Sequence, residues 1–251
     1  MRPPSSRDTT SSLTSGAHDL TVDLVHALSE SIGDVKPRLR GWLHLGLVPL
    51  ALVGGIVLIA LSPNNATRVG SAVYVASALL LFGVSAAYHR GTWPPETWRV
   101  LRRLDHCNIY VLIAGSCTAY ALLMLSGTDR AVMLALVWGS AVLGVTARFI
   151  WPDAPRWLSP PIYVLCGFGA VLFIPGFISG ASRFGAGTGA ATLTLMATGA
   201  VLYIVGAVVY GLRRPNPWPR WFGFHEVFHT FTILAFASHY VAVSLLTYSL
   251  R

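Results

Sequence analysis

The sequence predicts an all-α integral membrane protein, a seven-transmembrane helix bundle with its N-terminus in the cytoplasm and its C-terminus outside. Three observations lead to this fold class. Hydrophobic residues make up 54% of the 251-residue chain and charged residues only 11%, whereas about a quarter of the residues of a soluble domain are charged. Seven apolar segments each approach the roughly 20 residues that a helix needs to span a bilayer. Arginine and lysine are concentrated on alternate sides of these segments.

Residues 1–37 are expected to form a polar cytoplasmic tail and residues 38–251 the transmembrane domain. The first 18 residues are rich in Pro, Ser and Thr and offer almost nothing to bury, which is typical of disorder. From Asp19 onward, apolar residues recur at helical spacing opposite Asp23, Glu30 and Asp34, which predicts a short amphipathic helix. The tail lacks the apolar core of a cleavable signal peptide, so we expect the first span to be an uncleaved anchor.

The seven apolar segments are predicted to be membrane spans. In chain order they cover residues 41–61, 69–88, 105–126, 131–150, 157–178, 188–212 and 225–248. Pro49 and Pro175 lie inside the first and fifth spans, where a proline removes a backbone hydrogen bond and marks a kink. The three cysteines all lie within apolar segments, so we expect free thiols.

The distribution of the eighteen basic residues predicts the orientation. They gather in the N-terminal tail and in the loops that follow the second, fourth and sixth spans. The opposite side has only four of them, Arg68, Arg130, Arg183 and Arg251. Because basic residues are enriched in cytoplasmic loops, the N-terminus is expected inside and the C-terminus outside. An even number of spans would break this alternation.

Polar side chains within the apolar spans converge on the predicted cytoplasmic end. Ser85 and His89 end the second span, Asp105 begins the third, and His225 and His229 begin the seventh. Ionisable groups inside a membrane are unfavourable unless they are paired or coordinated. His225 and His229 are four residues apart, so on a helix they share one face and can bind one metal ion.

Three histidines with an open fourth position are the arrangement of a catalytic zinc site. His89, His225 and His229 are therefore the predicted metal ligands. Asp105 would act on the metal-bound water as a general base or hold it in place, and it forms the predicted catalytic pair with Ser85. His44, in the first turn of the first span, shares the same depth and is a reserve ligand or a residue that contacts substrate.

Simpler interpretations remain for these residues. A histidine near the headgroups can make only an interfacial hydrogen bond. Asp105 can cap the third span, because a carboxylate is favourable at a helix N-terminus. Ser85 can bond back to the carbonyls of its own helix.

Two further polar residues of the seventh span are assigned no place in the site. Glu226 is rotated by about 100° from His225, so it is expected to face Arg220 or the headgroups. His239 lies about 15 Å deeper than His229, too far to share a metal ion, and is expected to make an interhelical hydrogen bond.

Three short motifs resemble the signatures of the haemolysin III proteins, the bacterial branch of the progestin and adiponectin receptor family, with alkaline ceramidases as more distant relatives. They read Ser85-Ala-Ala-Tyr-His89, Arg103-Leu-Asp105-His-Cys-Asn-Ile-Tyr and Phe224-His225-Glu-Val-Phe-His229. The resemblance extends from about Arg38 to Val243. It implies zinc held by His89, His225 and His229, with Asp105 and Ser85 near the metal-bound water.

One segment departs from the receptor members of that family. They carry an acidic and amide motif before the histidine of the first span, whereas this chain reads Arg38-Leu-Arg40-Gly-Trp-Leu-His44. The departure argues against receptor-like ligand recognition, although His44 itself is matched.

The sequence therefore predicts a zinc-binding, multi-pass protein of a bacterial plasma membrane that hydrolyses a lipid amide or ester and serves membrane-lipid homeostasis. Three imidazoles also accept other divalent ions, copper above all. Membrane lipids are the expected partners. Nucleic acid is not, because the basic residues form no single soluble face.

Two other functions stay open at this point. One is a haemolysin-like pore-forming cytolysin, against which the mainly apolar outer halves of the spans argue. The other is a non-enzymatic sensor of membrane state with structural zinc, in which Asp105 would be a fourth ligand that closes the site. A transporter would need charged groups at the midplane and repeated interrupted helices, which the sequence lacks.

Overall fold

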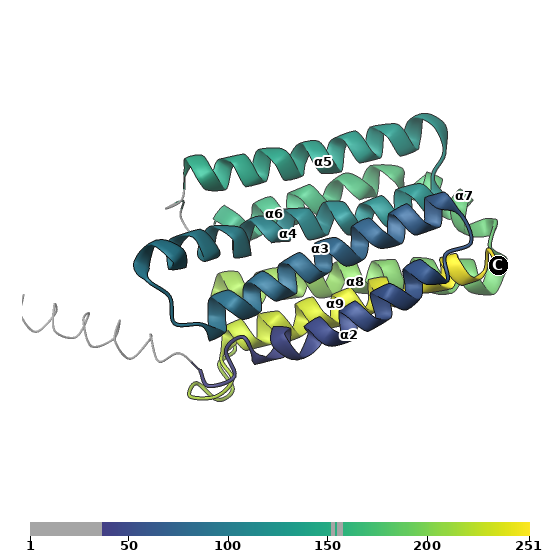
Figure 1. The fold of residues 1–251 in the computed structure, drawn as a ribbon. Coiled ribbons are helices and arrows are strands. Elements are labelled where there is room, and N and C mark those ends of the chain that lie inside the picture. The colour runs from purple at the N-terminus through teal and green to yellow at the C-terminus, as the bar shows by residue number, and fades with distance from the viewer. Residues whose placement is uncertain (1–36, 152–153, 155–157) are drawn as a thin grey trace, which may run out of the picture.

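The computed structural model describes residues 37–151, 154 and 158–251 as a bundle of helices (Figure 1). Residues 1–36 of the predicted tail, with its expected helix, lie outside the described residues. The helices are α2 (Trp42–Ala60), α3 (Asn65–Arg90), α4 (Pro95–Met124), α5 (Gly127–Ile150), α6 (Ser159–Phe168), the 3-10 helix η2 (Gly169–Phe173), α7 (Ile174–Ser182), α8 (Ala186–Leu212) and α9 (Phe224–Tyr248). Within this part of the chain, seven helical segments are long and apolar enough to cross a membrane, with α6, η2 and α7 together forming one of them. The seven-helix membrane fold is therefore confirmed.

The third span begins earlier than the sequence predicted. It was expected to open at Asp105, whereas α4 begins at Pro95. Proline is favourable at the first position of a helix, because an N–H at that position would have no partner within the helix. Asp105 consequently lies about three turns inside the helix and does not cap it, so the capping interpretation is wrong.

The fifth span is broken close to the position that its proline predicted. α6 ends at Phe168, a single 3-10 segment follows, and α7 begins with Ile174 and Pro175. The proline occupies the first turn of α7, where its lack of an N–H is tolerated. Pro49 lies inside α2, and the helix continues past it.

α4 is the central helix of the bundle (Figure 1). In its most apolar stretch 78% of the residues are buried, against 22% in α2, α5 and α8. Small residues bring α3 close to it: a Cβ added to Gly115 would lie 2.2 Å from the Ser77 Oγ, and such residues let membrane helices approach closely. On the outer helices Leu50 and Leu143 are 70% and 72% exposed, as expected of side chains that face lipid.

Backbone contacts bring the beginnings of α2 and α9 together. The Arg38 N–H donates to the Arg220 carbonyl at 3.0 Å, and the Leu39 N–H donates to the Trp221 carbonyl at 3.2 Å. α2 and α9 then run side by side, and α3 ends at the same end of the bundle (Figure 1). We call this end, where α3 ends and α2 and α9 begin, the site end.

Candidate metal centre

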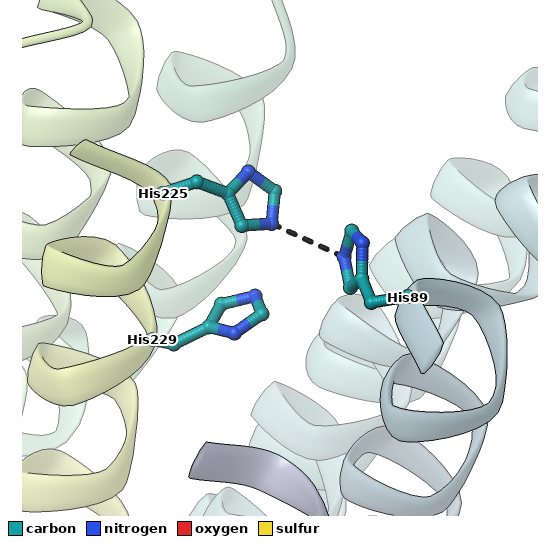
Figure 2. Close-up of side chains that lie close together, drawn as sticks. All are labelled: His89, His225 and His229. Atoms are coloured by element: carbon teal, nitrogen blue, oxygen red, sulfur yellow. Dashed lines mark hydrogen bonds between the residues drawn. The ribbon is translucent and has the colours of Figure 1, made fainter. Parts of the chain in front are cut away.

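Three histidines converge at the site end of the bundle. His89 comes from the last turn of α3, and His225 and His229 come from the first two turns of α9. One ring nitrogen from each lies within 4.8 Å of the other two. Figure 2 shows the three rings pointing toward one another across the gap between the two helices. We refer to them as the histidine trio, and the structure brings together all three predicted ligands.

The histidine trio has the donor chemistry of a metal site. The Nε2 atoms of His89 and His225 face each other at 3.1 Å. The donor nitrogens of a tetrahedral site lie roughly 3.3 Å apart when each is about 2.0 Å from the metal. A divalent ion that prefers imidazole nitrogen would satisfy these donors, so the trio can hold a metal ion.

Asp105 lies beside the trio on its metal-facing side. Its Oδ2 is 3.8 Å from His89 Nε2, the same nitrogen that faces His225. A carboxylate that only orients a ligand histidine would contact the other ring nitrogen. At 3.8 Å the pair is also too long for a direct hydrogen bond, which leaves Asp105 close to the metal position without binding His89 directly.

Ser85 lies one turn before His89 on α3 and is 2% exposed. Its hydroxyl is beside the Asp105 carboxyl. The buried Ser85 hydroxyl therefore has a polar neighbour on another helix, and a bond back to its own helix is not needed to satisfy it. The two residues predicted to be catalytic thus lie next to each other and next to His89, and their chemical roles stay predictions.

His44 adjoins the trio from the first turn of α2. Its ring stacks on His229, with centroids 3.8 Å apart and planes inclined by 13°, and it contacts the Phe82 ring edge-on at 5.0 Å. His44 is 2% exposed, and both of its ring nitrogens lack a hydrogen-bond partner within the described part of the chain. The reserve residue therefore lies at the site, in contact with one face of a predicted ligand.

Glu226 differs from its prediction. It is fully buried and forms an ion pair with Arg40, whereas the sequence analysis placed it toward Arg220 or the headgroups. The reason is that the segment before α2 folds over the start of α9 and carries Arg40 inward. The signal that could have revealed this was the basic residue in the segment just before His44.

His239 lies apart from the trio, as predicted. Its Nδ1 is 2.8 Å from the Tyr120 hydroxyl, which joins α9 to α4. The expected interhelical hydrogen bond is therefore confirmed. His239 also stacks on Tyr203 of α8, so it links three helices deeper in the bundle.

The chain is similar in sequence to proteins of one family. A family model described as haemolysin-III related matches residues 33–240. The Hemolysin-3 homolog of Bacillus subtilis is 28% identical over 199 residues, which cover 78% of this chain and 87% of that protein. Hemolysin-3 of Bacillus cereus is 26% identical over 187 residues, which cover 73% and 79%.

The similarity extends to animal proteins. The adiponectin receptor protein of Drosophila melanogaster is 27% identical over 225 residues, which cover 81% of this chain and 49% of the receptor. The three motifs that contribute the histidine trio and Asp105 all fall inside residues 33–240, the region that the family model matches. Because the family model spans nearly the whole membrane-embedded part, the chain is a multi-pass membrane protein that belongs to the haemolysin-III related family, within the wider group that includes the progestin and adiponectin receptors.

Proposed function

We propose that the protein is a zinc-dependent hydrolase of a lipid amide or ester that acts in membrane-lipid homeostasis in a bacterial plasma membrane. The observation that carries the proposal is the placement of Asp105. Its carboxyl lies on the metal-facing side of the histidine trio, 3.8 Å from His89 Nε2, and beside a buried serine hydroxyl. A structural metal site could use the carboxyl as its fourth ligand, but it has no need of the serine hydroxyl beside that carboxyl.

Each side chain has a role in this proposal. The histidine trio would hold zinc, which polarises a carbonyl and makes a bound water more acidic. Asp105 would accept the proton of that water, because a carboxylate near the water is suited to general base catalysis. Ser85 would donate a hydrogen bond to the substrate oxygen on which negative charge develops.

The position of the site favours a lipid substrate. The trio lies at the end of α3 and the start of α9, near one edge of the apolar bundle, and the amide or ester bond of a membrane lipid lies at the same boundary between headgroup and hydrocarbon. His89 and His229 are 7% and 2% exposed and His225 is half-buried, and we propose that the substrate reaches them between helices from the membrane. This lateral route suits a lipid substrate.

The first prediction concerns metal content. Full-length protein purified in detergent without chelators should contain zinc, measured by mass spectrometry of the metal, and His89→Ala, His225→Ala and His229→Ala should each lose it. His106→Ala is the matched control, because His106 lies on α4 next to Asp105 but bonds the Arg102 carbonyl through Nδ1 at 2.6 Å. It should retain the metal. A wild-type protein without metal, or metal retained by all three variants of the trio, contradicts the proposal.

The second prediction separates catalysis from structure. Asp105→Asn keeps the shape of the side chain and removes the base, so it should retain zinc while the hydrolysis of a ceramide or phospholipid substrate falls by about 10²–10⁴-fold. Asp129→Asn, in the first turn of α5 at the other end of the bundle, should leave both unchanged. Fatty-acid release and metal content are measured on the same preparations.

The structural-zinc sensor is the second candidate, and the same placement of Asp105 favours it. A carboxyl on the metal-facing side can also be a fourth ligand, which would close the site. In that case Asp105→Asn loses zinc and melts early, and the hydrolase proposal fails. The pore-forming cytolysin is less favoured, because large buried side chains such as Tyr74, Phe82 and Phe236 fill the middle of the bundle. Conductance of purified protein in planar bilayers would reverse that ranking.

A further inference from the structure

Residues 37–42 pass across the site end of the bundle and lead into α2, whose first residue is Trp42, and we call this segment the strap. Its backbone is tied to the segment that leads into α9 by the two hydrogen bonds from Arg38 to Arg220 and from Leu39 to Trp221. The Arg38 guanidinium also lies over the Trp221 ring, 4.7 Å from its centroid. The two backbone hydrogen bonds therefore anchor one side of the strap to the segment that leads into α9, and the exposed Arg38 side chain adds only a weak surface contact.

The strap is also linked to Glu226, the residue that follows His225 in α9. The Arg40 Nε donates to Glu226 Oε1, and the Gly223 N–H donates to Glu226 Oε2 at 2.8 Å. Both carboxylate oxygens are thus occupied in a fully buried environment, where an unpaired carboxylate would be strongly unfavourable. The bond to Gly223 caps α9 at the residue that precedes its first turn, and it therefore holds in place the turn that contains His225.

The other side of the strap contacts the third member of the trio. Gly41 has a φ of +81°, a left-handed conformation that favours glycine. A Cβ added there would lie 2.8 Å from the Cβ of His89 and 3.1 Å from the Cγ of Arg90. The Arg90 guanidinium lies over the Trp42 ring at 4.1 Å. The strap therefore presses directly against the last turn of α3.

α3 and α9 have little direct contact with each other, whereas α2 packs against both. The strap is thus the local connection between the His89 end of α3 and the His225 end of α9. We propose that it sets the separation of His89 and His225, and that Arg40 and Glu226 are the positioning residues that make it rigid. This inference rests on metal binding by the trio, as in the proposed function, but not on hydrolysis.

The test measures zinc affinity of the full-length protein by competition with a chelator. Arg40→Met leaves Glu226 buried without its cation, and residues that hold metal ligands in place typically change metal affinity by 10–100-fold. We therefore expect zinc affinity to fall by about 10–100-fold in Arg40→Met, to fall less in Arg40→Lys, and to stay within about threefold of wild type in Arg38→Met. Arg38 is the matched control, because it lies on the same strap and contacts Trp221 rather than Glu226.

A double variant tests whether the two residues act as one unit. Arg40→Met combined with Glu226→Gln should lose no more affinity than the worse single variant, because both changes remove the same link. The absorption spectrum of cobalt-substituted protein reports ligand geometry directly, and it should change in Arg40→Met and not in Arg38→Met. These readouts do not move if the strap merely stabilises the fold.

Two results would overturn the inference in distinguishable ways. If Arg40→Met melts at a lower temperature but its folded form keeps wild-type zinc affinity and cobalt spectrum, the strap has only a structural role and the proposed function is untouched. If the wild-type protein binds neither zinc nor cobalt, this inference and the proposed function both fail. Normal metal affinity without any lipid hydrolysis would reject the hydrolase and leave the role of the strap standing.

Discussion

At the scale of single residues, the histidines of this site differ in what their nitrogens contact. The trio presents its nitrogens to a common point, and His89 and His225 come within 3.1 Å of each other. His44 instead presents the face of its ring to His229, and neither of its nitrogens has a hydrogen-bond partner among the residues described. The contact that the structure shows for His44 is therefore packing against a predicted ligand.

This contact leads to a prediction about His44. His44→Phe preserves a flat ring against His229 and removes two buried polar atoms without partners, so it should retain zinc and melt at the same or a higher temperature. His44→Ala leaves a cavity beside His229, which should lower the free energy of unfolding by about 2–5 kcal/mol, as for other large buried side chains, and weaken zinc binding. Thermal melting and chelator competition check both variants. Loss of zinc in His44→Phe would instead make His44 a metal ligand.

At the scale of elements, glycine determines how closely α3 and α4 approach. A Cβ on Gly115 would lie 2.2 Å from the Ser77 Oγ and 3.3 Å from the Val73 carbonyl oxygen. It would also lie 2.7 Å from the Ser77 Cβ, which is attached directly to the backbone, so the two helices would have to move apart. The contact matters for function, since α3 carries Ser85 and His89 and α4 carries Asp105.

Gly115→Ala should therefore separate the two helices and lower the free energy of unfolding by about 1–3 kcal/mol, the usual effect of overpacking. Gly139→Ala is the matched control on α5, where an added Cβ meets nothing within 4 Å. It should be neutral or stabilising, because alanine favours helix over glycine by about 1 kcal/mol. Thermal melting in the same detergent compares the two variants. Equal melting temperatures would show that α3 and α4 do not depend on this contact.

At the scale of the whole molecule, the bundle separates a buried centre from a lipid-facing surface. α4 occupies the centre, and the trio lies at one end of the bundle between α2, α3 and α9. His239 with Tyr120 and Tyr203 forms a second polar group deeper inside, which connects α4, α8 and α9. The site end is the end that the basic loops place toward the cytoplasm, and this orientation stays a prediction from the positive-inside rule.

Much of this architecture could be predicted from the sequence because its signals are local. Each span is a continuous apolar segment, because its side chains face lipid or the apolar core. Such a segment must be a helix, because only a helix satisfies all of its backbone hydrogen bonds within itself. The trio could be predicted because His225 and His229 have metal-ligand spacing and His89 ends a neighbouring span. The start of α4 could not be located, because the polar turns from Pro95 to Leu104 are helical without being apolar.

The sequence by itself determined the seven spans, the depth of the polar residues and the three histidines that can share a metal ion. Only the tertiary structure decided which residues surround the three histidines. The side of His89 that Asp105 approaches, the stacking of His44 on His229 and the burial of Glu226 against Arg40 all depend on how α2, α3, α4 and α9 pack. Helical periodicity places a side chain on one face of its own helix, whereas its partner comes from a helix far away in the chain.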